Sequence, residues 1–392
     1  MKRVVIVKAN RTPNGSFGGS LSGFSAVELG GAAILEVLKA SGIKQKNVQE
    51  VAFGHVLTAG AGQAPARQAA IRAGLSEKTP CTTINKVCAS GMKAIMIAAD
   101  QIRLGQSDIM VAGGMESMSN VPYYLPEHRF GSRLGSSKVV DGIIKDGLWD
   151  VYKDYHMGNA AELCASRYNI SREDQDQYAV TSYRRAIEAH EKGYYKDEII
   201  KMKVKDRDGT VREITVDEEL EKINFDQVSR LRPVFDREGT VTPANASSIN
   251  DGAAAVLLMS EEKAKGHGLS PLAVIRSYGS TAKSPEWFTT APADAIPAVL
   301  KRAGLKIEEI DLFEINEAFS VVSIINNRLL ELDPEIVNIQ GGAVSIGHPI
   351  GCSGARIVVT LLHALKRTKG RLGCAAICNG GGGASALVVE ML

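Results

Sequence analysis

Residues 37–54 read VLKASGIKQKNVQEVAFG, and residues 299–316 read VLKRAGLKIEEIDLFEIN. The two stretches align without a gap at an offset of 262, and each combines a helix end, a glycine that stops the helix and an alternating strand. A second match follows at nearly the same offset, because Cys88-Ala89-Ser90-Gly91 resembles Gly351-Cys352-Ser353-Gly354. Two matches in register predict an internally duplicated chain.

Strand and helix signals alternate in both halves. We expect strands at 3–9, 48–57, 82–87, 108–114, 272–280, 310–315 and 373–379. We expect helices at 25–41, 89–104, 292–303, 317–330 and 353–368, the first of which opens with the capping box Ser25-x-x-Glu28. This alternation predicts an α/β fold in which helices cover parallel-dominated sheets and functional sites lie at the carboxyl ends of the strands.

Residues 119–248 interrupt the duplicated pattern. They carry 20 basic and 23 acidic residues, a much higher charge density than the rest of the chain. This segment is either plain surface or a cap that shapes a binding cleft. We therefore expect a first half made of residues 1–118 with 249–268, an inserted loop domain at 119–248, and a second half at 269–392.

The composition excludes several classes of protein. With 46 basic and 44 acidic residues the net charge is +2, far from the basic excess of a nucleic-acid binder. The sequence has no apolar run long enough for a transmembrane helix, so no membrane partner is expected. Six cysteines in so long a chain favour a reducing compartment, the cytoplasm, or the mitochondrion if the sequence is a processed form.

Cys88 stands where an apolar strand passes into a helix, in Asn85-Lys86-Val87-Cys88-Ala89-Ser90-Gly91. The helix dipole and free N–H groups favour a reactive thiolate there, although most cysteines are small buried hydrophobic residues. His348 lies in a glycine- and proline-rich turn before the helix that repeats the Cys88 helix. An exposed imidazole at that position could accept the thiol proton, or it could simply bond to the backbone of a loop.

Cys378 ends an apolar strand and is followed by Asn379 and four glycines, Gly380 to Gly383. Backbone amides beside a thiol suggest an oxyanion site, and tight packing is the alternative. Cys374-x-x-x-Cys378 lacks a second cysteine pair, so no metal cluster is expected there. Asn316 also follows a strand, where it could orient a water or a substrate carbonyl, or merely cap a helix.

Taken together, four ordered motifs resemble those of the thiolase family, and most of all its acetyl-CoA C-acetyltransferase branch. The motifs are Asn85 to Gly91, Asn316-Glu317-Ala318-Phe319, Gly347-His348-Pro349-Ile350-Gly351 and Cys378-Asn379-Gly380-Gly381-Gly382. The resemblance covers essentially the whole chain. It implies a duplicated α/β/α/β/α five-layered fold with an inserted loop domain that holds coenzyme A.

The resemblance also implies a reaction, the reversible Claisen condensation of two acetyl-CoA molecules to acetoacetyl-CoA and CoA. Cys88 would take the acetyl group as a thioester after His348 has activated its thiol. Cys378 would remove the α-proton of the second acetyl-CoA. One oxyanion hole would consist of His348 and a water held by Asn316, and the other of the amides of Cys88 and Gly380.

Further expectations from the resemblance concern the ligands and the assembly. Coenzyme A is expected against Leu148, His156, Met157, Tyr183, Lys222, Ile223, Asn224, Phe235, Ser247, Ala318 and Phe319. A potassium ion is expected at Tyr183, Pro243, Ala244, Ala246 and Val344, although proline replaces the alanine usual at position 243. Residues 121–140 correspond to a tetramerisation loop, which implies a homotetramer. No cofactor is expected to be required, since the CoA thioesters are substrates.

Three rival classes remain for comparison. A ketoacyl synthase-like enzyme shares this duplicated fold but usually has histidine where Cys378 stands. A non-catalytic acyl-CoA-binding protein would not need Cys88, His348, Asn316 and Cys378 together. A cysteine hydrolase would use neither the second cysteine nor a layer large enough for CoA. Branched substrates are not expected, because Trp287-Phe288-Thr289-Thr290 stands where relatives that accept a 2-methyl group have a Phe-Pro pair.

Overall fold

The computed structural model describes residues 1–205 and 208–392. A mixed sheet passes through the whole molecule in the order β14-β15-β16-β13-β1-β12-β5-β3-β4, with β2 (Gly15–Ser16) beside β12. The first half contributes β1 (Val4–Arg11), β3 (Glu50–Gly54), β4 (Cys81–Ile84), β5 (Ile109–Ser117) and β12 (Asn250–Ser260). The second half contributes β13 (Ala273–Ala282), β14 (Leu312–Ile315), β15 (Leu372–Asn379) and β16 (Gly383–Met391).

The two halves have the same strand topology. In the first, β4, β3 and β5 are parallel, and β12 and β1 continue the sheet antiparallel. In the second, β14 and β15 are parallel, and β16 and β13 continue it antiparallel. A parallel bridge from Phe313 to Val337 occupies the place of β4. The halves join where Val5 and Ile6 pair with Val274 and Ala273.

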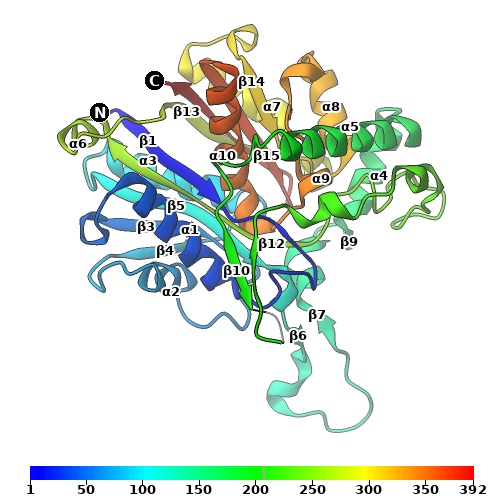
Figure 1. The fold of residues 1–392 in the computed structure, drawn as a ribbon. Helices are drawn as coiled ribbons and strands as arrows, with labels where there is room; N and C mark the ends of the chain where they lie inside the picture. Colours follow the sequence, from blue (N-terminus) through cyan, green and yellow to red (C-terminus); the bar gives the residue numbers. More distant parts are fainter. Residues whose placement is uncertain (206–207) are drawn as a thin grey trace.

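Five layers follow from the way helices cover this sheet (Figure 1). Helices α1 (Ala26–Ser41) and α2 (Pro65–Arg72) cover the outer face of the first half. Helix α7 (Pro292–Ala303) covers the outer face of the second half, with α8 (Ser320–Leu330) beside it. Between the halves, α3 (Ser90–Arg103) packs directly on α10 (Ile350–Thr368). The expected five-layered, duplicated α/β fold is therefore confirmed.

The segment between the halves forms a cover rather than a third sheet. It contains the helices α4 (Met157–Arg167) and α5 (Arg172–Glu191) and the small antiparallel pairs β6 (Tyr123–Tyr124) with β7 (Val140–Asp141), β8 (Trp149–Asp150) with β9 (Tyr155–His156), and β10 (Met202–Lys205) with β11 (Val211–Ile214). The loop between β6 and β7 extends away from the body of the molecule (Figure 1). The domain boundaries at 118 and 248 stay a prediction.

Several local expectations need correction. The sheets are not dominated by parallel pairs, because β12 and β16 each run antiparallel to both of their neighbours. The segment from Asn250 to Ala255, where no strand was expected, is the start of the buried strand β12. Helix α8 begins at Ser320 rather than 317, and α10 at Ile350 rather than 353. Helix α2 was not expected, nor were α6 (Glu261–Gly266) and the single turn α9 (Ala343–Ile346).

Among the described residues, no helix is long and apolar enough to cross a membrane.

The expected capping box of α1 is present. Ser25 Oγ accepts a hydrogen bond from the Glu28 amide, and the Glu28 carboxylate accepts one from the Ser25 amide.

A fully buried arginine ties the inserted segment to the core. Arg11, at the end of β1, donates to Glu198 Oε1 at 2.6 Å and to both carboxylate oxygens of Asp217 at 2.7 and 2.8 Å. All three side chains are completely shielded from solvent. Because both acids lie in the insertion, the network fixes that segment onto the first half.

We predict that Arg11→Met lowers the free energy of unfolding by about 3–5 kcal/mol, because two buried carboxylates lose their counter-ion. Arg3→Met is the matched control, since it breaks only the exposed pair of Arg3 with Glu261 and should cost no more than about 1 kcal/mol. Urea unfolding midpoints measure both changes. Equal losses in the two variants would contradict a structural role for the buried network.

Candidate active site

The turn before α3 presents Cys88. Val87 adopts φ of +48°, a left-handed conformation that is rare for a β-branched residue and marks a strained turn. Ser90 stabilises this turn, because its Oγ accepts from the Lys86 amide at 2.7 Å and donates to the Val87 carbonyl at 2.6 Å. Helix α3 starts at Ser90, so Cys88 stands just before its amino end.

One pocket brings most of the predicted site residues together. It has a volume of about 340 Å³ and is lined by Cys88, His348 and Gly380. Seven of the residues expected to hold CoA also line it: Leu148, His156, Met157, Phe235, Ser247, Ala318 and Phe319. Phe235 stacks on His156 with ring centroids 4.7 Å apart and meets Phe319 edge-on, which forms an aromatic wall.

Cys378 and Asn316 stand behind the pocket surface. Cys378, at the end of β15, is 1% exposed and packs with Met157 and Ala318. Its thiol lies near enough to Cys88 for the charge of that residue to raise its pKa, although burial is the larger cause. The amide nitrogen of Asn316 is buried and has no acceptor within the described part of the chain. Asn316 Nδ2 can therefore donate to an oxygen brought beside the pocket.

The resting thiol of Cys88 differs from the expectation of a thiolate. Burial raises its pKa to about 11, and the backbone amides of Gly380 and of Cys88 itself lower it only in part. The helix end and amides act in the expected direction, but the loss of water outweighs them. The same two amides act on the sulfur, so they lie close to where the oxygen of an acyl group bonded to Cys88 would sit.

His348 is also buried rather than exposed as expected, with 7% of its surface accessible. Burial lowers its pKa to about 3, and the positive charge of Arg356 adds to the shift. Its Nδ1 lies 2.5 Å from Ser353 Oγ, which donates its own hydrogen to the Pro349 carbonyl at 2.8 Å. With its one hydrogen on that carbonyl, the hydroxyl is an acceptor toward Nδ1, which favours the Nδ1–H tautomer. Nε2 is therefore left as a base facing the pocket.

Two buried glutamates organise the surrounding loops and were not expected from the sequence. Glu116 accepts from the amides of Val56, Leu57 and Gly351, and so holds the turn after His348. Glu317 accepts from Tyr178, Ser182, Asn338 and the Val344 amide. Glu317 could have been found from the sequence because it lies within the Asn316 motif. No feature of the sequence indicated a role for Glu116.

The remaining predicted ligand residues lie elsewhere. Four residues expected to contact CoA do not line the pocket: Tyr183, Lys222, Ile223 and Asn224. Tyr183 instead packs with Ile223 and Val344 in a separate cluster. In the set expected to bind potassium, Pro243 and Ala246 line the pocket and Ala244 is buried. The pocket also contains residues that the sequence did not single out: Met118, Gly147, Val234, Ser248, Ile249 and Ile350.

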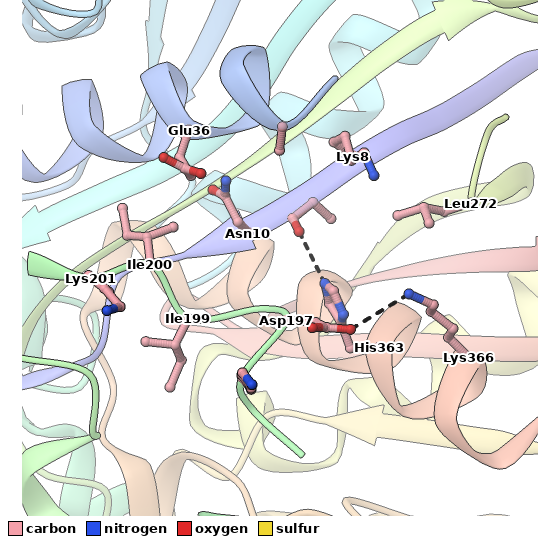
Figure 2. Close-up of a pocket in the computed structure, with 13 residues that line it drawn as sticks. Lys8, Asn10, Glu36, Asp197, Ile199, Ile200, Lys201, Leu272, His363 and Lys366 are labelled. Carbon is pink, nitrogen blue, oxygen red and sulfur yellow. Dashed lines mark hydrogen bonds and ion pairs between the residues drawn. The ribbon is translucent and has the colours of Figure 1, made fainter. Parts of the chain in front are cut away.

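A second pocket, of about 540 Å³, opens elsewhere between β1, α1 and α10 (Figure 2). Four exposed or half-buried lysines line it together with Glu36, Asp197 and several apolar residues, and Lys366 Nζ lies 3.7 Å from Asp197. His363 bonds to the Ala9 carbonyl at its edge. None of the predicted site residues lines this second pocket.

A duplicated α/β scaffold with two cysteines, a histidine and an asparagine around one largely apolar pocket defines a class of acyl-transferring enzymes. The family profile described as the thiolase N-terminal domain matches residues 4–262, and that of the thiolase C-terminal domain matches residues 269–391. The chain belongs to the thiolase family. The prediction of an acyltransferase is thereby confirmed.

Individual relatives match over nearly their full length. Acetyl-CoA acetyltransferase 2 of Arabidopsis thaliana is 56% identical over 99% of this chain and 97% of its own. The mitochondrial acetyl-CoA acetyltransferase of Bos taurus is 53% identical over 100% of this chain and 92% of its own. The crystal structure of the Acat5 thiolase from Ascaris suum in complex with coenzyme A has a TM-score of 0.94 at 44% identity, with complete coverage of both chains.

We predict that His348 stays neutral, with its proton on Nδ1, as the pH falls from 7 to 5. The sign follows from its pKa, which is lowered to about 3, so the ring protonates only in stronger acid than an ordinary histidine. Nitrogen NMR of histidine-labelled protein measures this, with His348→Asn to assign the signal. Ser353→Ala should lose the tautomer preference, and an imidazolium at pH 6 in the parent protein would contradict the assignment.

Proposed function

We propose that the chain is an acetyl-CoA C-acetyltransferase that condenses two acetyl-CoA molecules reversibly to acetoacetyl-CoA and CoA through an acetyl-cysteine. One observation carries the proposal: Cys88, His348 and the Gly380 amide meet in a pocket whose remaining wall is apolar and aromatic. Such a wall suits the thin arm of a CoA thioester, whose amides can bond to the few polar groups in the lining, among them Ser247 and Ser248.

In the first half-reaction, Cys88 attacks the acetyl thioester. His348 Nε2 takes the thiol proton as the sulfur bonds to the acetyl carbon. The negative charge that develops on the carbonyl oxygen is stabilised by the amides of Cys88 and Gly380. Collapse of this intermediate breaks the bond to the CoA sulfur, which leaves as the thiol after it recovers a proton from His348. The products are acetyl-Cys88 and free CoA.

In the second half-reaction, Cys378 removes the α-proton of a second acetyl-CoA. Burial raises its pKa well above the ordinary value, so its thiolate, formed when His348 Nε2 takes the thiol proton, is a strong base. The enolate oxygen is stabilised by His348 and by a water held at Asn316 Nδ2. The enolate carbon attacks acetyl-Cys88 and breaks its bond to the Cys88 sulfur, which takes the proton held on His348 Nε2 and becomes a thiol again. In the reverse direction, Cys378 activates the thiol of CoA.

This proposal accounts for both cysteines, which the rival functions do not. A ketoacyl synthase-like enzyme would have histidine at position 378, and a hydrolase would need an entry for water instead of an acceptor substrate. No cofactor is required, because CoA thioesters supply both reacting groups.

We also propose a homotetramer, supported by the exposed Phe130, Leu134 and Val139 on the loop that extends between β6 and β7. We further propose a reducing, cytoplasmic location, supported by six free thiols.

The residues expected to bind potassium fit a monovalent cation chemically. Tyr183 and Val344 pack together in one buried cluster with Ala179. Carbonyl oxygens of Pro243, Ala244, Ala246 and Val344 are hard donors of the kind such ions prefer. A bound cation would stabilise the loop of Ala246 and Ser247 against the pocket, and it takes no part in the bond-breaking steps.

We predict that Cys88→Ala forms no acetyl-enzyme and loses condensation by at least about 10⁴-fold, because the nucleophile is gone. Cys378→Ala should still gain the mass of one acetyl group on Cys88 while condensation falls about 10²- to 10⁴-fold, the usual contribution of a general base. Mass spectrometry and a coupled acetoacetyl-CoA assay measure the two steps. Cys81→Ala, on the edge strand β4, is the control and should keep both. Normal condensation by Cys88→Ala would refute the proposal.

We predict that thiolysis of acetoacetyl-CoA is faster in potassium chloride than in sodium chloride at equal ionic strength. Tyr183→Phe should abolish the difference, since it removes the side-chain oxygen from the cation site. Initial rates in the two salts measure the effect, with Tyr168→Phe as a control that leaves the site intact. Identical rates in both salts for the parent protein would remove potassium from the proposal.

A further inference from the structure

A buried arginine next to the active site has no role in the chemistry described above. Arg356 is the second arginine, after Arg11, among the largest fully buried side chains, with 1% of its surface accessible. It lies on α10, three residues after Ser353, so both project from the same side of the helix. Burial of so large a cation costs several kcal/mol unless it serves a purpose that compensates.

The guanidinium faces the strand that carries Asn316. Arg356 Nη2 lies 3.5 Å from Asn316 Oδ1, and Nη1 lies 3.6 Å from Glu314 Oε2. Glu314 and Asn316 are two residues apart at the end of β14, so their side chains leave the backbone on one face. Arg356 therefore contacts the side chains of both residues at this strand end.

The contact with Arg356 determines the orientation of the Asn316 side-chain amide. A guanidinium has five donors and no acceptor, so only the oxygen of the amide is attracted to it. The NH2 group must then face away from Arg356. Asn316 Nδ2 is buried and finds no acceptor among the described residues, which leaves its hydrogens free for an oxygen that enters with the substrate or with water.

The charge of Arg356 acts on the histidine as well. After burial, it is the cause that lowers the pKa of His348. Burial raises the pKa of Glu314 to about 8, so near neutral pH its carboxyl is largely protonated and compensates little of the arginine charge. The same side chain therefore orients Asn316 and favours the neutral, proton-accepting form of His348.

We infer that Arg356 is a positioning residue of the acyl-transfer site, which orients the Asn316 amide toward the enolate oxygen. The inference rests on the proposed function, because it assigns a purpose to the Asn316 side of the pocket in that reaction. Ser353 and Arg356, on successive turns of α10, then position the two members of one oxyanion site, His348 and Asn316.

The test is a double-mutant cycle between Arg356→Met and Asn316→Ala, with kcat and KM of acetoacetyl-CoA synthesis as readouts. Arg356→Met should lower kcat about 10- to 100-fold, part of the effect of losing an oxyanion-hole donor, with KM for acetyl-CoA nearly unchanged. In the Asn316→Ala background the same change should cost less than about threefold, because the group that it positions is already absent. A purely structural role would give the same loss in both backgrounds and would overturn the inference.

Two further variants keep the test decisive. Arg356→Lys retains the charge without the planar fork, so it should fold if Arg356→Met does not, and should recover only part of kcat. Arg367→Met removes an arginine from the same helix that bonds to Gln340 and covers the Tyr194 ring, and should keep full kcat. Full kcat in both Arg356 variants would overturn the inference while the parent enzyme still condenses acetyl-CoA. Lack of condensation by the parent enzyme would refute the proposed function instead.

Discussion

The active site depends on how closely the two central helices approach each other. A methyl group added at Gly91 on α3 would lie 2.8 Å from the backbone nitrogen of Ala355 on α10, and one at Gly354 would lie 2.6 Å from that of Met92. Neither distance is possible for a real side chain, so the starts of α3 and α10 meet backbone to backbone. One helix follows the nucleophile and the other follows the histidine. The glycines at this crossing are therefore what brings the two halves of the chemistry within reach of each other.

The same close packing explains the electrostatics of the site. His348 and Cys378 are buried and Cys88 is half-buried, and this burial shifts each pKa so that the histidine is neutral and both cysteines are thiols at rest. Negative charge develops only during the reaction, and the backbone amides and other hydrogen-bond donors already in place stabilise it. Preorganised donors are most effective where water is excluded, since no solvent has to reorganise as charge develops. Burial thus raises the free energy of any ion in the resting site. It also strengthens the interaction of each fixed dipole with the charge that develops during the reaction.

Much of the fold could be predicted from the sequence, because duplication and hydrophobic periodicity are properties of local residues. Strand β12 could not, since it opens with Asn250 and Asp251 and continues with three alanines, a composition with little preference for strands. Neither could strand direction, which depends on neighbours far along the chain. The residues of the candidate site could be predicted from sequence motifs, but their burial could not. His348, for example, lies in a turn rich in glycine and proline that other parts of the chain cover. Tyr183 shows the remaining limit, because its helix turns it toward Val344 rather than into the pocket.

The matching topology of the halves has an evolutionary consequence. Each half places a helix start and a strand end at the crossing, so two identical copies would have formed a symmetric site with the same groups on both sides. Such a site treats its two ligands alike. Condensation requires a donor and an acceptor that are handled differently, with an acylated cysteine on one side and a base on the other. Because both copies are in one chain, each can carry different residues, so a duplicated scaffold of this kind can distinguish the two identical substrate molecules of the proposed condensation by position alone.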